Sequence, residues 1–481
     1  MMMSGTIAGA PCRDLLVGGA WRSSTSQSSV IYPYTGEIVA SVANARPADV
    51  EDAIAASVDA FAVTRRLPAY KRAEILQRAA ALIEERGEEL ARQIVRESGN
   101  PIGETRGEVA RTVTIFQIAA EEAKRIGGEI IPLDVAPAGE RRLGEIRRFP
   151  IGPVAGITAY NAPLLLPAHK IAPAFAAGNP VIVKPAPRTP LSALSLGEIL
   201  LAAGMPAGAL SVLPCDVATA EPLVTDERLK ALSFTGSVPV GWALKARANR
   251  KRVTLELGGN GAVIIHHDAD LEWAATRCAT GGFLRAGQAC IAVQRIYVHQ
   301  DVYEPFLALL LAHVRAIKMG DPMDPATTMG PLIDEEAARR AERWVEEAAA
   351  AGATVRVGGR RQGLFLEPTV LTEVTHQMKV SCEEVFAPVV VVTPYNTFDQ
   401  ALAWTNSTPY GLQAGVFCHD LRLVYRAFEE LEVGGLIVND INSWRVDSMP
   451  YGGVKASGFG REGLRSAIEE FTEPRLLVLK L

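Results

Sequence analysis

The sequence is poor in the features that mark disulfide-rich, membrane and secreted proteins. Its 481 residues include only six cysteines, scattered from position 12 to position 418 without a CxxC pair. This usage is typical of a reducing compartment, so we expect a cytoplasmic protein with free thiols. Residues 1–20 lack the basic and long apolar regions of a signal peptide. No stretch approaches the roughly eighteen apolar residues of a membrane helix, so we expect no membrane partner.

Strong charge and metal-binding or hydrolase motifs are also missing. The net charge of -5 gives no electrostatic reason to bind nucleic acid. The seven histidines form no HExxH motif, and the adjacent His266 and His267 would point to opposite faces of a strand. No serine lies in a GxSxG segment. We therefore expect no metal site and no serine hydrolase.

The length and composition favour a large globular chain. Hydrophobic residues make up 48% and charged residues 21%, which is ordinary for a soluble protein. The chain is too long for one hydrophobic core, so we expect two or three structural units.

Apolar spacing predicts helices first and an alternation of strands and helices later. Residues 47–130 carry apolar positions at helical spacing, and residues 133–148 alternate weakly, as an extended hairpin would. From residue 150 short apolar runs alternate with helical stretches at 189–203 and 237–248, which favours parallel sheets. The expected strands are 154–157, 181–183, 211–213, 231–234, 253–257, 262–265, 294–298, 388–393, 414–417 and 435–438.

Polar or glycine residues follow three of the expected strands directly. Asn161 comes after 154–157, Lys184 after 181–183, and Gly236 and Ser237 after 231–234. Parallel sheets bind ligands at the carboxyl ends of their strands. Lys184 could bind a ribose or a phosphate, and Gly236 and Ser237 could bring a phosphate to a helix N-terminus. Each is weak alone, because glycine and serine also cap helices.

Cys290 is the best candidate for a nucleophile. It follows a glycine-containing loop after a helix that we expect to begin near Asp270, whereas Cys278 falls at the apolar spacing of that helix and is expected in the core. Glu256 lies on an alternating strand with Thr254 on the same face, where it could activate a water beside the Cys290 sulfur. An exposed glutamate would give the same pattern.

One motif is expected to mislead. Residues 458–463 match GxGxxG, but no strand leads into them, and fewer than twenty residues remain after them for a second strand. We predict a loop there rather than a dinucleotide-binding turn.

Taken together, these segments resemble the aldehyde dehydrogenase superfamily over nearly the whole chain, in the order of the family's motifs. The segments that carry the resemblance are 16–21, 150–157, 159–163, 183–186, 234–237, 255–259, 287–290, 383–388 and 450–458. Residues around Cys290 and 445–450 are most similar to the lactaldehyde dehydrogenase-like branch.

The resemblance implies an α/β fold of three units. A Rossmann-type dinucleotide-binding domain with a five-stranded core would span 1–128 and 151–257, and an α/β catalytic domain would span 258–452. A bridging β-element of 129–150 and 467–481 would make homodimers or homotetramers.

The resemblance also implies the mechanism. A Cys290 thiolate would add to an aldehyde, with the oxyanion held by the Asn161 amide and the Cys290 backbone N–H. Hydride transfer to NAD or NADP would leave a thioester, which water activated by Glu256 would release as the acid. The cofactor would be bound by Lys184, Gly236, Ser237, Glu384 and Phe386, of which Glu384 would hold the nicotinamide ribose.

Departures from the family pattern bear on the cofactor and the substrate. Pro187 stands where many NAD-selective members carry a glutamate, so NADP is a candidate. Ala289 and Ala162 replace an arginine and a histidine that some members use for phosphorylated aldehydes, which weakens a strongly anionic substrate. Arg111, on the helix that lines the substrate tunnel in the family, and Arg445, in the mouth segment, favour an anion, although either would also fit a surface salt bridge.

Several functions remain open. The substrate is expected to be a small hydroxy-aldehyde, a semialdehyde or an aromatic aldehyde. The nearest alternative is a CoA-acylating semialdehyde dehydrogenase, a branch that typically lacks the general-base glutamate. A cofactor-independent cysteine hydrolase would need a histidine near Cys290, and a non-catalytic homologue would not need the three residues Asn161, Glu256 and Cys290.

Overall fold

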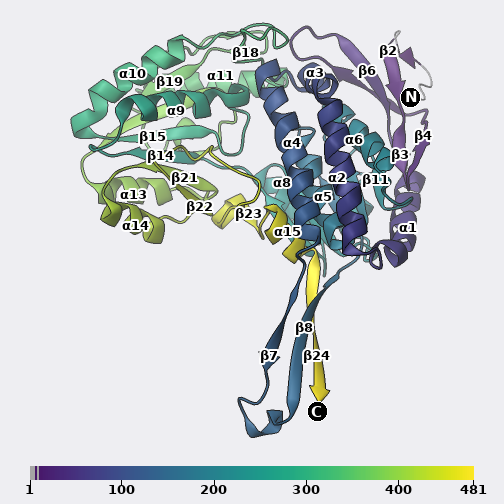
Figure 1. The fold of residues 1–481 in the computed structure, drawn as a ribbon. Helices are drawn as coiled ribbons and strands as arrows, with labels where there is room; N and C mark the ends of the chain where they lie inside the picture. Colours follow the sequence, from purple (N-terminus) through teal and green to yellow (C-terminus); the bar gives the residue numbers. More distant parts are fainter. Residues whose placement is uncertain (1–5, 8–9) are drawn as a thin grey trace.

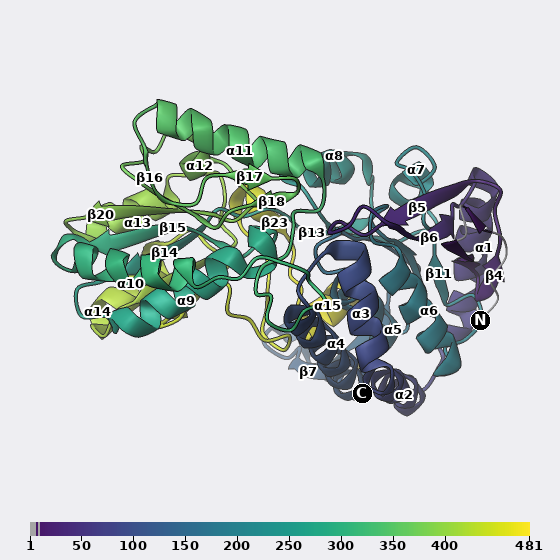
Figure 2. The same ribbon diagram turned by 90° about the horizontal axis from the view of Figure 1, so that it is seen from above.

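The computed structural model describes residues 6–7 and 10–481. Two α/β lobes lie side by side, and a narrow β arm projects from the lower end of the first lobe, below α15 (Figure 1). Seen from above, the strands of the N-terminal segment lie at the outer edge of the first lobe (Figure 2). Within the described residues, no helix is long and apolar enough to cross a membrane.

The first lobe is built on an eight-stranded sheet whose central five strands are parallel. The order is β23-β13-β12-β9-β10-β11-β3-β4, and the antiparallel strands β23, β3 and β4 lie at its edges. The parallel five-stranded core that the resemblance implied is therefore present. Its strands are β9 (Val154–Ile157), β10 (Val181–Lys184), β11 (Leu210–Val212), β12 (Ala231–Thr235) and β13 (Arg252–Glu256), and the edge strands are β3 (Leu15–Val17), β4 (Ala20–Arg22) and β23 (Gly458–Phe459).

Helices cover both faces of this sheet because successive strand side chains point to opposite sides. Val181 and Val183 pack into one core and Ile182 into the other. The first core lies under α2 (Ala69–Glu85), α3 (Gly87–Ser98), α4 (Ile102–Ala123), α5 (Leu165–Ala177), α6 (Leu191–Ala202) and α15 (Leu464–Glu470). The second lies under α1 (Pro47–Thr64), α7 (Glu221–Thr225) and α8 (Val238–Arg247).

The second lobe has a seven-stranded sheet of order β16-β19-β20-β15-β14-β21-β22, parallel except for β16. Its strands are β14 (Gly261–Ile265), β15 (Val293–His299), β16 (Thr354–Val357), β19 (Thr369–Thr372), β20 (Val389–Tyr395), β21 (Gln413–Phe417) and β22 (Gly435–Val438). One face packs on α9 (Leu271–Phe283), α10 (Tyr303–Arg315), α11 (Glu335–Ala350) and α12 (Lys379–Cys382), and the other on α13 (Phe398–Asn406) and α14 (Leu421–Glu430).

The arm consists of β7 (Gly128–Pro132), β8 (Arg142–Pro150) and β24 (Thr472–Lys480), which pair antiparallel in the order β24-β8-β7. The expected hairpin is present, but its first strand comes before residue 133 rather than within 133–148. Two small sheets complete the fold: β1 (Thr6–Ile7), β2 (Ala10–Arg13), β6 (Ile38–Ala43) and β5 (Gln27–Ile31), and the pair β17 (Arg361–Gln362) and β18 (Phe365–Leu366). The domain bounds given above remain a prediction.

Two local expectations were wrong. Gly458 and Phe459 form β23, paired antiparallel with β13, so only the rest of 458–463 is a loop. Only two residues of β23 pair with β13, and they come from a distant part of the chain. Such a short strand leaves no apolar periodicity in the sequence. His266 and His267 were expected to point to opposite faces of a strand, but they lie beyond the end of β14. Their rings lie together, with centroids 4.3 Å apart. Cys278, in contrast, lies in the core as expected.

Candidate active site

A cavity of about 330 Å³ lies where the two sheets face each other. From the first lobe it is lined by residues that follow the carboxyl ends of β9, β12 and β13. From the second it is lined by Cys290 and Glu384, which precede β15 and β20, and by the first turns of α11. The chain reverses its strand order at β9, which lies between β10 and β12. Such a switch point leaves a crevice at the carboxyl edge of a parallel sheet.

The cavity brings together most of the residues that the sequence singled out. Its lining includes Asn161, Gly236, Ser237, Glu256, Cys290, Glu384 and Phe386. Lys184, Arg111 and Arg445 are not among the residues that line it. Lys184 ends β10 and is buried, which lowers the pKa of its amine.

The loop that carries Cys290 has an unusual backbone. Arg285, Ala286 and Gly287 all have positive φ, at 52°, 54° and 72°. A side chain on Gly287 would meet the Ala387 carbonyl oxygen 2.1 Å from its Cβ. Left-handed residues other than glycine cost about 1–2 kcal/mol each, so contacts elsewhere must hold this loop in place.

Those contacts come from two carboxylates on α4: Glu104, which accepts from the Arg285 backbone N–H at 3.1 Å, and Glu108. Glu108 makes the larger set. Its Oε1 accepts from the Leu164 and Leu165 backbone N–H groups at 3.0 and 3.1 Å, where α5 begins. Its Oε2 accepts from Arg285 Nη2 at 3.1 Å. Arg285 Nη1 in turn donates to the Asn161 carbonyl at 2.9 Å. The same buried carboxylate thus fixes both the Asn161 turn and the Cys290 loop.

The Asn161 side chain is aimed at the Cys290 loop. Its Nδ2 donates to the Gln288 carbonyl at 2.9 Å and retains a second N–H, since an amide nitrogen carries two. Together with a backbone N–H of the loop, that second donor could hold an oxyanion.

The Cys290 thiol lies among charged and polar groups. Its Sγ is 3.3 Å from the Tyr451 hydroxyl. Burial, together with the charges of Glu256 and Glu384, raises the pKa of the thiol to about 11, although the Tyr451 hydrogen bond and Arg445 lower it. The groups with the largest effects on the pKa of this thiol, among the described residues, include no histidine, so the geometry lends no support to a cysteine–histidine hydrolase.

Glu256 is buried rather than exposed, with 4% of its surface accessible. Both carboxylate oxygens are buried without a hydrogen-bond partner. Burial and the neighbouring Glu462 raise the pKa of Glu256 well above its usual value, against the attraction of Lys170 and Arg445. An orphaned carboxylate that lines a cavity beside a thiol is suited to take up a proton from a water molecule.

Gly258 and Gly259 explain how Glu384 approaches the cavity. Glu384 Oε1 accepts from the Gly259 N–H at 3.0 Å, and burial raises the pKa of this carboxyl to about 7. A Cβ on Gly258 would lie 2.1 Å from Glu384 Oε2, so only glycine leaves room for the carboxylate. Phe386 packs edge-on against Tyr160, with ring centroids 6.0 Å apart.

Sequence reasoning missed a buried charge network beside the thiol. Lys170 forms a fully buried ion pair with Glu462, which lies in the GxGxxG segment. Asp447 accepts from Arg111 at 2.6 Å and faces His169 at 3.3 Å. Apolar periodicity could not have found them because Lys170 and His169 lie on a helix buried all round. Tyr451 lies in the family-like segment 450–458, but the sequence alone does not indicate that its hydroxyl contacts Cys290.

The two candidate arginines differ in the structure. The Arg445 side chain is 9% exposed and lies inside the network, so it is neither at the mouth nor a surface salt bridge. Arg111 remains 38% exposed and makes two hydrogen bonds to Asp447.

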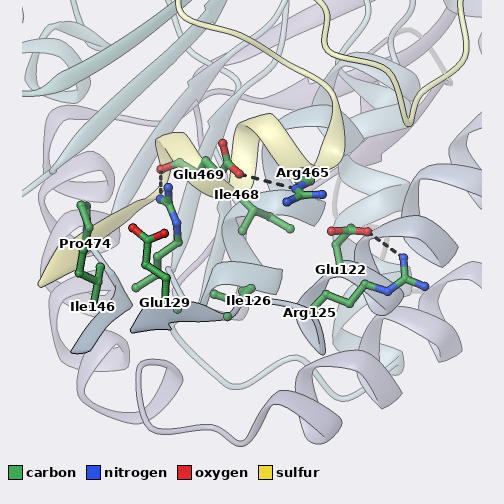
Figure 3. Close-up of a pocket in the computed structure, with 12 residues that line it drawn as sticks. Glu122, Arg125, Ile126, Glu129, Ile146, Arg465, Ile468, Glu469 and Pro474 are labelled. Carbon is green, nitrogen blue, oxygen red and sulfur yellow. Dashed lines mark hydrogen bonds and ion pairs between the residues drawn. The ribbon is translucent and has the colours of Figure 1, made fainter. Parts of the chain in front are cut away.

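Two other features lie away from this cavity. In the described part of the chain, His266, Asp268 and Cys418 form a group whose ligand atoms are within 4.8 Å of one another, at the opposite edge of the second sheet. A larger hollow of about 530 Å³ lies at the base of the arm, lined by Glu122, Arg125, Glu129 and Glu469 among others (Figure 3). It has none of the candidate catalytic residues.

Replacing Glu108 by alanine tests how the site is held. The variant removes the carboxylate that is nearest to the buried Arg285 guanidinium and the acceptor of two backbone N–H groups, so we expect a loss of about 3–5 kcal/mol of stability. The melting temperature should fall by several degrees, and iodoacetamide should label Cys290 at an altered rate. Glu88→Ala is the matched control, because Glu88 also lies near α4 and pairs with arginine, in its case Arg92 and Arg106, but is exposed. It should change stability by less than about 1 kcal/mol. Equal melting temperatures for the two variants would contradict this account.

Comparisons with known proteins agree with the site geometry. The family model for the aldehyde dehydrogenase family matches residues 21–477. A 3-sulfolactaldehyde dehydrogenase of Priestia aryabhattai is 46% identical, over 97% of this chain and 98% of its own length.

Solved structures are equally similar. Aldehyde dehydrogenase 21 from Physcomitrella patens, in complex with the reaction product succinate, superposes with a TM-score of 0.96 at 44% identity, covering 98% of both chains. Glyceraldehyde-3-phosphate dehydrogenase from Methanocaldococcus jannaschii, complexed with NADP, gives a TM-score of 0.91 at 34% identity, covering 95% of this chain and all of that one. With the buried thiol, the amide and the orphaned carboxylate in one cavity, these matches show that the chain belongs to the aldehyde dehydrogenase family.

Proposed function

We propose that this protein oxidises an aldehyde to a carboxylic acid with NAD or NADP, through a thioester on Cys290. The observation that carries the proposal is the single cavity that holds Cys290, Asn161 and Glu256 from three separate parts of the chain. The Cys290 sulfur forms a bond to the aldehyde carbon, and the Asn161 amide and the Cys290 backbone N–H stabilise the resulting oxyanion. A nicotinamide cofactor held beside Cys290 would supply the acceptor for one hydride from this adduct, and the product on Cys290 would be a thioester.

Glu256 completes the cycle. Its carboxylate takes a proton from a water molecule, the water oxygen adds to the thioester carbon, and the carbon–sulfur bond breaks to release the acid and the thiolate. A CoA-acylating enzyme would need no such base. The orphaned Glu256 oxygens at the cavity wall therefore favour water over CoA as the acceptor.

The residues present fit a nicotinamide cofactor. Because Gly258 has no side chain, the Glu384 carboxylate can reach the cavity wall. Ser237, at the start of α8, lines the same cavity. We assign Gly236, Ser237, Glu384 and Phe386 to the cofactor, with Lys184 at the end of β10 beyond the cavity. Pro187 and Arg188 are exposed, and no carboxylate stands at Pro187 to repel a 2′-phosphate. NADP is thus accommodated as well as NAD.

The Glu256→Gln variant tests the mechanism. It should form the thioester and then stop, so mixing with aldehyde and cofactor should give a burst of about one NAD(P)H per active site and little turnover. Steady-state kcat should fall by a factor on the order of 10² or more. Cys290→Ala should show neither burst nor turnover. Full turnover in Cys290→Ala, or acid formation only when CoA is added, would contradict the mechanism.

For the substrate, we propose a short aldehyde that carries a carboxylate or sulfonate at its far end. The support is Arg445, whose charge lies beside the thiol and whose Nε is buried without a hydrogen-bond partner. Arg111, still 38% exposed, offers a second cation farther out. The names of the similar proteins, which mention 3-sulfolactaldehyde and succinate, point to the same class.

A panel of aldehydes with both cofactors tests the substrate class. Succinic semialdehyde and 3-sulfolactaldehyde should give higher kcat/KM than butanal and lactaldehyde. In Arg445→Met the ratio of kcat/KM for succinic semialdehyde to that for butanal should fall about 10- to 100-fold, as expected when a hydrogen bond to a charged group is lost. A ratio that does not change would assign the anion site elsewhere, and an absence of NAD(P)H formation with every aldehyde would contradict the proposed function.

We propose further that the arm joins this protein to a second copy. Both edges of its three-stranded sheet are free in the described chain, and it exposes Ile130, Leu476, Leu477, Val478, Leu479 and Leu481. Exposed apolar residues on an unpaired strand are suited to pair with another strand.

The six cysteines are free, which supports a reducing, cytoplasmic location.

Light scattering after size-exclusion chromatography tests the arm. The wild-type protein should have the mass of a dimer or tetramer, and a variant with Leu477→Glu and Leu479→Glu should shift to the monomer. Val217→Glu, at an exposed valine away from the arm, is the control and should keep the wild-type mass. A monomeric wild-type protein would overturn the proposal.

A further inference from the structure

Tyr451 is held in one place by contacts on all sides. Only 3% of its surface is accessible. Its backbone N–H donates to the Glu462 carbonyl at 3.0 Å, and its own carbonyl accepts from the Glu462 N–H at 2.6 Å. Its hydroxyl then lies 3.3 Å from Cys290 Sγ. Because the backbone is fixed, the hydroxyl cannot move far from the thiol.

Arg445 lies on the face of the Tyr451 ring. Its guanidinium carbon is 3.6 Å from the ring centroid. Two carboxylates lie near the guanidinium. Asp447 Oδ1 is 3.8 Å from Arg445 Nε and Glu462 Oε2 is 3.9 Å from Arg445 Nη2, and both distances are too long for a hydrogen bond. Asp447 is already bonded to Arg111, and Glu462 to Lys170. The charge of Arg445 is therefore only partly neutralised, and it acts on the ring.

A cation on the face of a phenol makes its O–H a better donor. The cation attracts the electron density of the ring and draws it away from the oxygen. Burial raises the pKa of Tyr451 well above its usual value, so the hydroxyl keeps its proton. The stack therefore presents a strong, permanently protonated donor to the sulfur.

Apart from this donor and Arg445, the surroundings of Cys290 oppose a thiolate. The thiol is buried, and two carboxyl groups face it: Glu256 from the end of β13 and Glu384 from the segment before β20. Both disfavour a second negative charge beside them. Tyr451 and Arg445 are the groups that favour it.

We propose that the Tyr451 hydroxyl, polarised by Arg445, donates a hydrogen bond to the Cys290 thiolate and so raises the fraction of the nucleophile that is ionised at a given pH. The inference rests on the proposed function and adds a residue to its mechanism. On ionisation the thiol proton passes to solvent, the S–H bond breaks, and Tyr451 keeps its own O–H bond.

The pH dependence of Cys290 alkylation tests this role without substrate or cofactor. Iodoacetamide, which is uncharged, reacts with the thiolate, and mass spectrometry of the Cys290 peptide separates it from the other five cysteines. A hydrogen bond to a charged group contributes about 1.5–3 kcal/mol. Tyr451→Phe should therefore move the midpoint of the alkylation profile upward by about one to two pH units. At neutral pH the reaction should be roughly 10- to 100-fold slower.

Tyr395→Phe is the matched control. It removes another buried tyrosine hydroxyl, bonded to His266 at 2.9 Å, at the far end of β20 from Cys290. Its alkylation profile should coincide with that of the wild-type protein. A shift of similar size in this control would show a general loss of packing and overturn the assignment.

An unchanged profile in folded Tyr451→Phe protein also overturns the proposal. If that variant does not give a cooperative melting transition, Arg445→Met is measured instead. We expect the midpoint of its alkylation profile to move upward by a smaller amount, and an unchanged midpoint would contradict the proposal. Because the assay needs neither aldehyde nor cofactor, its result is separate from that of the aldehyde panel. A shifted profile in a protein that oxidises no aldehyde would retain the role of Tyr451 and reject the proposed function.

Discussion

The Glu108 carboxylate joins parts of the chain that no single lobe would hold together. It caps the start of α5 in the first lobe and pairs with Arg285 in the second. The loop it anchors is strained, with two non-glycine residues in the left-handed region. Strain of about 1–3 kcal/mol per residue persists only where neighbouring contacts determine the backbone. This buried ion pair, with the hydrogen bonds from Arg285 to the Asn161 carbonyl and from the Asn161 amide to the Gln288 carbonyl, fixes the thiol loop relative to the Asn161 amide.

Chemistry at this site needs charged groups in a place that is shielded from bulk solvent. The first sheet contributes its carboxyl edge and the second its amino edge, so the cavity lies between two cores instead of on one surface. Glu256, Glu462, Lys170 and Arg445 all lie there with little or no exposure. Buried charges stabilise a fold poorly, but they act strongly on one another at low dielectric. The network thus sets the protonation of the reacting groups at the expense of stability.

Much of this arrangement was predictable from the sequence, and the reasons for the remainder are physical. Strand and helix periods located the sheets, and the strand-end rule located Asn161 and Gly236, because both depend on local pattern. Glu256 and Cys290 needed the family resemblance to be paired, since 34 residues of chain give no hint that they meet. Tyr451, Glu462 and Lys170 were beyond reach because their contacts join segments 292 or 161 residues apart. Arg445 was placed at the mouth because sequence cannot tell a buried arginine from an exposed one.

The return of the chain to its first lobe has a consequence for the order of folding. β23 pairs with β13, and α15 packs against α5, so residues 458–470 complete a lobe whose other strands end by residue 256. On the ribosome those residues emerge after the whole second lobe has been made. Until then Lys170 lacks its carboxylate and β13 is an open edge. The nascent first lobe is therefore an incomplete folding unit. A chain that ended shortly before residue 458 would lack β23, the core residues of α15 and the C-terminal arm strand.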